Sequence, residues 1–206
     1  DKAAYSFDAK KKFGINVSSL LWDDNTRGRF GLSIDYKAFY RSLITYLIET
    51  GEYQVHIIPH VIDNKNYEAA ENDYRVCCEL EKEFKGHVIL APAFETAIQA
   101  KSYISNMDVF LGSRMHSTIG AISSGVATIP LSYAYKFEAL YSHINYPYVI
   151  NARKATTEEA LKMTKQWASE RDKLKETGEI AVSHALDELV DFKNDLKISL
   201  KNNDIL

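Results

Sequence analysis

Short apolar runs alternate with longer amphipathic segments along the first 150 residues. The first run, at 13–17, is followed by a polar loop over 23–31 and by a helical pattern that places Phe39, Leu43, Tyr46 and Leu47 on one face and ends at Gly51. Similar apolar runs predict further strands at 55–60, 87–90, 107–112 and 126–131, with a weaker one at 148–150. The intervening segments predict helices at about 66–85, through 97–103, through 115–122 and at 136–143.

Continuous apolar strands that are each separated by one helix favour a parallel sheet, because every return crossover must lie on a face of the sheet. The predicted fold class is therefore α/β, with a doubly wound, mainly parallel sheet of about six strands and helices on both faces. We expect this Rossmann-like domain to occupy residues 1–150.

The last 50 residues have a different pattern. They predict two helices, 157–177 and 179–201, divided at Gly178, and the apolar positions on them indicate that residues 151–206 pack on this sheet or on a partner domain outside the chain. The chain starts without Met and reaches its first strand within about a dozen residues. We therefore expect a segment of a longer protein.

The amino-acid composition favours a globular domain and argues against several other classes of protein. The 206 residues are 46% hydrophobic and carry a net charge of −3, which is typical of a globular domain and argues against a general nucleic-acid or polybasic membrane-surface protein. No run of about 18 apolar residues and no signal-peptide pattern is present. Adjacent Cys77 and Cys78 suit neither a disulfide framework nor a zinc site. We expect a cytoplasmic protein, with the inner face of the membrane as an alternative location.

Ligands of open parallel sheets bind where the strands end and helix N-termini present free N–H groups. The turn after the 107–112 strand gathers Ser113, Arg114, His116 and Ser117. Arg114 offers a fork of donors for phosphate or carboxylate, and His116 exchanges protons near neutral pH. Ser113 and Ser117 either contact the same ligand or cap the helix. The alternative is that Arg114 pairs with a surface carboxylate and His116 is a packing residue.

Other turns on the same edge add candidates. Lys136 begins a helix, where a cation opposes the helix dipole unless an anion is bound, and Tyr133 suits the wall of a sugar site. His60 follows the second strand as a candidate acid or base. Arg27 and Arg29, in the first loop, are candidate phosphate contacts. In the alternative, these polar side chains are simply solvated.

The sequence lacks the motifs of several common nucleotide-binding and hydrolase sites. The chain has no Gly-x-x-x-x-Gly-Lys-Ser/Thr loop, no Gly-x-Gly-x-x-Gly in the first turn and no Gly-x-Ser-x-Gly elbow. The six histidines form no His-Glu-x-x-His motif. We therefore expect no metal.

The stretch from Val55 to about Ile144 resembles the polysaccharide pyruvyl transferase family. The resemblance rests on the strand ending Ile-Pro-His, the Asn72-Asp73 pair, the Met-Asp-Val-Phe-Leu-Gly-Ser-Arg-Met-His segment at 107–116, the Gly-Val-Ala-Thr-Ile-Pro segment at 125–130 and Tyr133-x-x-Lys136. The chain departs from the family pattern at Met115, commonly Leu, and at Ala127, commonly Pro.

The resemblance implies transfer of a pyruvate ketal from phosphoenolpyruvate to a saccharide or lipid-linked glycan during cell-surface or exopolysaccharide synthesis. It implies the C-terminal half of a two-Rossmann-domain enzyme of the glycosyltransferase B type, with the active site between the domains. Arg114, Met115 through its backbone, and His116 would bind the donor, with His116, Arg114 and His60 as catalytic candidates and without a cofactor. The alternatives are a nucleotide-sugar-dependent glycosyltransferase domain and a non-catalytic domain that binds an anion or a partner protein.

Overall fold

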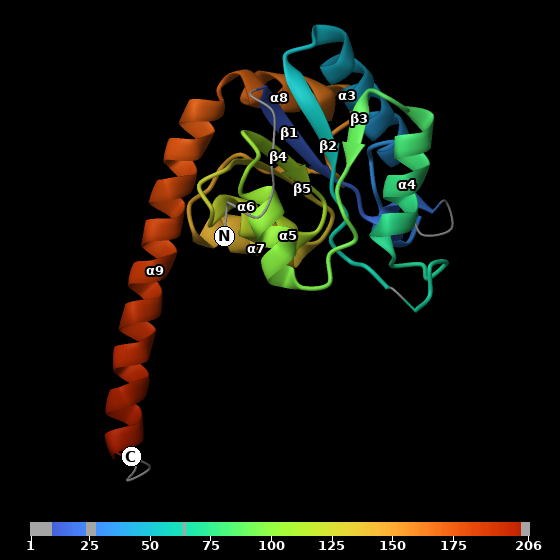
Figure 1. The fold of residues 1–206 in the computed structure, drawn as a ribbon. Helices are drawn as coiled ribbons and strands as arrows, with labels where there is room; N and C mark the ends of the chain where they lie inside the picture. Colours follow the sequence, from blue (N-terminus) through green and yellow to red (C-terminus); the bar gives the residue numbers. More distant parts are fainter. Residues whose placement is uncertain (1–9, 24–27, 64, 203–206) are drawn as a thin grey trace.

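A computed structural model of the chain describes residues 10–23, 28–63 and 65–202. It contains a six-stranded parallel sheet in the order β3-β2-β1-β4-β5-β6 (Figure 1). The strands are β1 (Lys11–Asn16), β2 (Tyr53–Ile57), β3 (Val88–Leu90), β4 (Val109–Gly112), β5 (Ala127–Ser132) and β6 (Ile150–Asn151). The order reverses direction at β1 and β4, as in Rossmann folds. The predicted fold class is confirmed.

Helices cover both faces of this sheet. The described helices include α1 (Ser19–Trp22), α3 (Tyr36–Thr50), α4 (Asp73–Glu83), α5 (Ala97–Ile104), α6 (Met115–Ile122), α7 (Tyr135–His143), α8 (Thr157–Ser169) and α9 (Arg171–Asn202). Helices α3, α4 and α8 pack on one face, and α5 and α6 pack on the other. A helical crossover joins each strand to the next one in the sequence, so all six strands run in the same direction. Their carboxyl ends therefore lie on one edge of the sheet.

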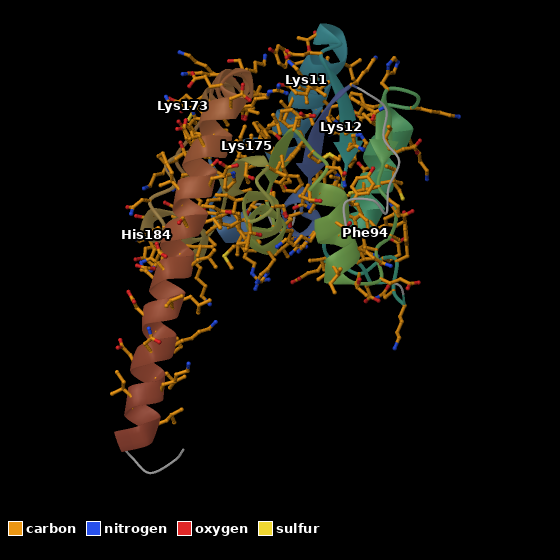
Figure 2. All side chains as sticks on the ribbon, turned by 60° about the vertical axis from the view of Figure 1, so that its left-hand side comes forward. Lys11, Lys12, Phe94, Lys173, Lys175 and His184 are labelled. Atoms are coloured by element: carbon orange, nitrogen blue, oxygen red, sulfur yellow. The ribbon has the colours of Figure 1, made fainter. Side chains whose placement is uncertain are left out.

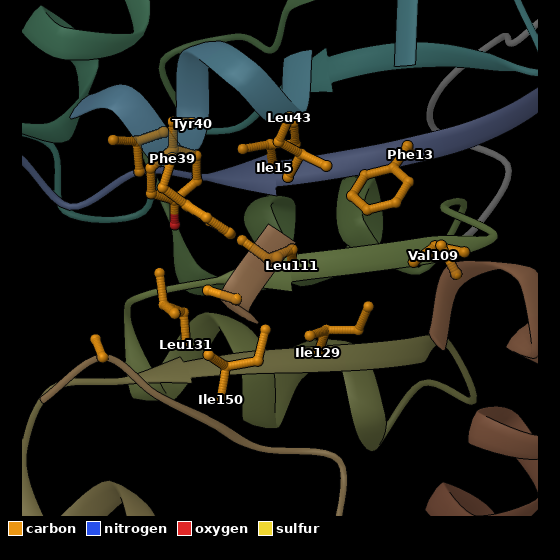
Figure 3. Close-up of a cluster of buried hydrophobic side chains, with 14 of the residues drawn as sticks. Phe13, Ile15, Phe39, Tyr40, Leu43, Val109, Leu111, Ile129, Leu131 and Ile150 are labelled. Atoms are coloured by element: carbon orange, nitrogen blue, oxygen red, sulfur yellow. The ribbon is translucent and has the colours of Figure 1, made fainter. Parts of the chain in front are cut away.

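The side chains that alternate along the central strands build the main core. Phe13 and Ile15 of β1 point toward Leu43 of α3, and Leu111 and Ile129 continue the same layer on β4 and β5 (Figure 3). All of these side chains are fully buried. The opposite face holds a smaller cluster around Phe110, Met107 and Tyr103.

Helix α4 is shorter than the predicted helix at 66–85. Asn72 ends the preceding turn, because its side-chain amide donates to the carbonyl oxygens of Asp63, Asn66 and Tyr67. Its Oδ1 accepts from the Tyr74 N–H as the N-cap of α4. The amide thus holds residues 66–71 outside the helix.

The predicted division of the C-terminal helices at Gly178 is wrong. The break lies at Glu170, and Gly178 lies inside α9. A Cβ at Gly178 would come within 3.1 Å of Ile122 Cγ1. This glycine therefore lets α9 approach α6 closely and does not end a helix.

The C-terminal part of α9 extends away from the rest of the domain (Figures 1 and 2). Leu174 and Ala181 are buried against the domain, whereas the large apolar side chains further along the helix are exposed, including Leu186, Leu189, Val190, Phe192, Leu196 and Ile198. Within the described residues, no helix is both long enough and apolar enough to span a bilayer.

A substitution at Gly14 tests how closely β1 packs on the smaller cluster around Phe110 and Met107. A Cβ at this position would lie 2.8 Å from both Met107 Cγ and Phe110 Cδ2. We predict that Gly14→Ala lowers the free energy of unfolding by about 1–3 kcal/mol, because these side chains must move.

The control is Gly120→Ala in α6, where the nearest atom to a new Cβ is at 3.9 Å. Alanine there should be neutral or stabilise the helix by about 0.5–1 kcal/mol. Urea unfolding of both variants checks the difference, and equal stabilities would contradict the packing argument.

Candidate functional site

The turns at the carboxyl ends of β1, β2 and β4 are joined by one buried carboxylate. The side chain of Asp73, the first residue of α4, is fully buried. Asp73 Oδ1 accepts from the backbone N–H of Ser19 at 2.9 Å and from Ser19 Oγ at 3.2 Å. Asp73 Oδ2 accepts from the backbone N–H groups of His60 at 3.4 Å and Val61 at 3.0 Å. One side chain therefore fixes the loops that follow β1 and β2.

Arg114, the residue that precedes α6, completes this cluster. Its Nε donates to both Asp73 oxygens at 3.2 Å, and its Nη2 donates to Asp73 Oδ1 at 2.8 Å and to the Glu71 carbonyl oxygen at 3.2 Å. Burial disfavours the charged guanidinium, but the charge and hydrogen bonds of Asp73 outweigh it and raise the pKa of Arg114. The partner of Arg114 is thus a buried carboxylate, and most of the predicted anion-binding fork is already occupied.

The Nη1 edge of the Arg114 guanidinium makes fewer contacts than the Nε and Nη2 edge. Nη1 lies 3.7 Å from Oε2 of the mostly exposed Glu71 side chain and makes no hydrogen bond with a described residue. This nitrogen is the part of Arg114 that can contact an anion without breaking the ion pair with Asp73.

Ser113 and Ser117 make their hydrogen bonds within the protein. Both are fully buried. Ser113 Oγ lies 2.6 Å from Tyr40 Oη, and Ser117 Oγ donates to the Arg114 carbonyl oxygen at 2.7 Å and to Asn16 Oδ1 at 3.1 Å. Asn16 Oδ1 also accepts from the Arg114 N–H. The serines hold the turn onto the end of β1, because their hydroxyls satisfy buried polar groups there.

Two tyrosines of α3 extend this buried network and were not among the predicted site residues. Tyr36 Oη accepts from the Ser18 N–H, and Tyr40 Oη donates to the Asn16 carbonyl oxygen. Burial raises the pKa of both phenols, so they stay protonated. Their spacing of four residues on the apolar face of a helix was the available signal, since a buried tyrosine needs a partner for its hydroxyl.

His60 and His116 both lie on this edge of the sheet. His116 is exposed in the first turn of α6, and His60 is partly buried after β2. Burial lowers the pKa of His60; Asp73 opposes this effect, and the positive charges of His116 and Arg114 add to it. His60 Nδ1 is buried and has no hydrogen-bond partner within the described residues. The charge of His116 therefore acts on His60, in the direction that favours the neutral His60 imidazole.

The remaining predicted residues lie beside this cluster. Tyr133 is half-buried after β5, where burial raises its pKa and the charge of Arg114 opposes the rise, and its ring packs edge-on against Phe30 at 5.2 Å. Lys136 is exposed in the first turn of α7, as predicted. Arg29 is exposed and its guanidinium lies 5.8 Å from the Phe30 ring centre. Met115 begins α6 with a partly exposed side chain, and Arg27 lies outside the described residues.

Backbone donors complete the site chemically. The amides of Met115 and His116 are the first two of α6, and these positions have no carbonyl partner within a helix. Together with Arg114 Nη1 and Lys136 they suit an anionic ligand. Among the residues that the structure describes, no three His, Cys, Asp or Glu side chains cluster as a metal site would require.

Asp73→Asn tests the central ion pair. The variant leaves the Arg114 charge buried without a counter-charge, so we predict a loss of about 3–5 kcal/mol in the free energy of unfolding. Chemical denaturation measures it. The control is Glu83→Gln, which removes the exposed pair with Arg41 and should cost less than about 1 kcal/mol. Similar losses in the two variants would contradict a buried, structural role for Asp73.

The lowered pKa of His60 predicts that the stability of the fold decreases as the pH falls below neutral. Because the folded pKa of His60 is lowered, the unfolded chain binds this proton first as the pH falls below about 6.5, and stability falls until the pH reaches the folded pKa. We predict that wild type loses more stability than His60→Gln between about pH 7.5 and about pH 5.5. Urea unfolding at both pH values measures the difference.

His87→Gln is the matched control, because His87 is an exposed histidine that precedes β3 on the opposite edge of the sheet. This variant should lose as much stability as wild type. If His60→Gln behaves like His87→Gln, the inferred direction for His60 is wrong.

A comparison with the sequence profiles of protein families agrees with the resemblance noted from the sequence. Residues 5–135 match the sequence profile of the polysaccharide pyruvyl transferase family. A search of curated protein sequences gives no significant match. Solved structures with a similar fold include the glycosyltransferase SnogD from Streptomyces nogalater, with 8% identity, a TM-score of 0.46 and coverage of 92% of this chain and 45% of that one.

Another similar structure is UDP-GlcNAc 2-epimerase from Neisseria meningitidis bound to UDP-GlcNAc, with 11% identity, a TM-score of 0.48 and coverage of 88% and 45%. The chain thus spans less than half the length of these structures. The family match covers most of the sheet and every element of the buried cluster around Asp73 and Arg114. The chain therefore belongs to the polysaccharide pyruvyl transferase family.

Proposed function

We propose that this chain is the donor-binding part of an enzyme that transfers a pyruvate ketal from phosphoenolpyruvate to two hydroxyl groups of a saccharide or a lipid-linked glycan. Family membership supports the reaction class. The observation that carries the assignment to this edge is the presence of His116 and His60 beside the anchored Arg114 at the start of α6.

The donor is a small dianion or trianion with a phosphate and a carboxylate, so it requires several donors at one place. Arg114 Nη1, the first two amides of α6 and the Lys136 ammonium supply them. Asp73 keeps Arg114 in one position and balances one positive charge, so the ligand meets a prearranged donor. In this proposal Arg114 both binds the donor and positions the turn.

The chemistry requires proton transfers in both directions. A proton is added to the methylene carbon of phosphoenolpyruvate, the resulting cationic carbon is attacked by one sugar hydroxyl, and the second hydroxyl replaces the phosphate. Two C–O bonds form, one C–O bond to phosphate breaks, and the two hydroxyl protons end on the methyl carbon and on phosphate. We assign the exposed His116 to proton donation and His60, whose pKa is lowered toward a neutral imidazole, to proton acceptance.

The exposed half of α9 fits a two-domain arrangement. Its apolar side chains extend beyond the sheet and are uncovered in this chain (Figure 2). We propose that they contact a second Rossmann-like domain of the whole protein, while residues up to 150 form the donor-binding domain. The candidate site would then lie in the cleft between the domains, from which water can be excluded during the reaction.

The proposal predicts phosphate release from phosphoenolpyruvate that depends on a saccharide acceptor and on His116. In the whole protein, His116→Gln should lower kcat by about 100-fold or more, because a positioned acid or base contributes at least that much. Phosphate release measures the rate, and the methyl signal of the ketal in NMR identifies the product.

His87→Gln, at the opposite edge of the sheet, should retain wild-type activity. A second control replaces phosphoenolpyruvate with nucleotide sugars. Turnover that requires a nucleotide sugar would assign the chain to glycosyl transfer instead, and full activity of His116→Gln would remove this residue from the reaction.

A further inference from the structure

A cavity at the carboxyl end of β6 lies on the same edge as the candidate donor site but shares none of its residues. Its volume is about 270 Å³, and it is lined by Gly31, Tyr135, Glu138, Asn151, Arg153 and Lys154. Strands β4, β5 and β6 are neighbours, so the turns that carry Arg114, Lys136 and Arg153 follow one another along the edge. A ligand in this cavity would therefore lie beside a donor bound at α6.

Hydrogen bonds from backbone and side-chain groups hold the walls of this cavity in place. The N–H groups of Ser33 and Ile34 donate to the Ala152 carbonyl oxygen, and Ser33 Oγ donates to the Arg153 carbonyl oxygen at 2.7 Å. Asn151 Oδ1 accepts from the Arg153 N–H at 2.9 Å. The segment after Gly31 is thus fastened to the loop after β6, although 120 residues separate Ser33 from Arg153.

Two cations line the cavity. The side chains of Arg153 and Lys154 are exposed, and neither makes an ion pair with a described residue. Among the lining residues that the structure describes, Glu138 is the one carboxylate. Two positive charges against one negative charge favour an anionic group at this position, and the planar fork of Arg153 suits a phosphate or a carboxylate.

The other lining groups suit a hydroxylated ring. Tyr135 exposes 78% of its surface at the rim of the cavity, where its flat face can cover the apolar face of a sugar. The Glu138 carboxylate and the Asn151 amide are acceptors and donors for sugar hydroxyls. A few polar groups around one aromatic surface are typical of a small-molecule site that fixes orientation.

The cavity continues into a larger hollow. A groove of about 570 Å³ along α8 shares Asn151 and Lys154 with it and adds the apolar side chains of Val149 and Met163 and the ammonium of Lys162. A ligand longer than one sugar residue can therefore extend from the cavity along α8.

We propose that this cavity binds an anionic saccharide, whose phosphate or carboxylate contacts Arg153 and Lys154 while its ring lies on Tyr135. The inference rests on the proposed function, for which it names the acceptor class: a glycan that carries a negative charge near the hydroxyls to be modified. The cavity is separate from the donor site, so its binding can be measured without the reaction.

NMR titration of the chain tests the cavity directly. The probes are glucose 1-phosphate, glucuronate and the neutral methyl glucoside. We expect glucose 1-phosphate or glucuronate to shift the backbone amide signals of Gly31, Asn151 and Lys154, and methyl glucoside to bind at least about tenfold more weakly. Arg153→Ala should weaken the anionic probe by about tenfold, because a charge-assisted hydrogen bond is lost.

Lys165→Ala is the control, because Lys165 is a cation of α8 that lies 4.1 Å from the Tyr46 ring centre, outside the cavity. It should bind the probes as wild type does. Equal binding of charged and neutral probes, binding unaffected by Arg153→Ala, or shifts confined to other residues would each overturn the inference.

A separate arm with phosphoenolpyruvate distinguishes this inference from the proposed function. Phosphoenolpyruvate should shift the amides of Met115 and His116 equally in wild type and Arg153→Ala. If that response is missing while the sugar acids bind at Gly31 and Asn151, the proposed donor is wrong and the saccharide site stands. If only the phosphoenolpyruvate response is seen, the saccharide site is wrong and the proposed function stands.

Discussion

The ion pair between Asp73 and Arg114 is the interaction on which the functional edge depends. The two residues are 41 positions apart, and the carboxylate also accepts from backbone or hydroxyl donors of Ser19, His60 and Val61. The loops after β1, β2 and β4 therefore meet at one buried charge. Such a charge is expensive to bury, so it persists where several donors compensate it together. The hydrogen bonds to Asp73 hold these three loops in fixed positions relative to one another.

The ion pair with Asp73 holds the Arg114 side chain in one position before any ligand binds. A solvent-exposed arginine would be a mobile cation that must be ordered when a ligand binds. Arg114 is already ordered, with Nε and Nη2 committed to Asp73 and Nη1 facing the less engaged side. The cost of ordering has been met during folding, which is the advantage of a preorganised site. His60 shares the arrangement, since its backbone N–H also donates to Asp73.

The candidate site was only partly predictable. The Arg-Met-His turn was found because an arginine and a histidine follow an apolar strand, and the structure places them at the sheet edge. The burial of Ser113 and Ser117 was not predictable, because it depends on Asn16 and Tyr40, which approach them only through the folded sheet. The cavity beside β6 is not predictable for a similar reason, since Gly31 and Arg153 are distant in sequence and line one cavity only in the folded chain.

The sequence by itself determined the alternation of strands and helices in the sheet domain. Apolar runs of strand length separated by amphipathic segments were enough for a parallel α/β sheet, and Gly51 marked the end of α3, where it adopts φ 63°. Tertiary structure decided strand order, the partners of the charged groups and the role of Gly178. The sequence pattern predicts a helix break at Gly178, yet this glycine lies inside α9, where a Cβ would come within 3.1 Å of Ile122 Cγ1. Local patterns report the conformational preference of the chain near a residue, whereas burial and ion pairing depend on neighbours that only folding brings together.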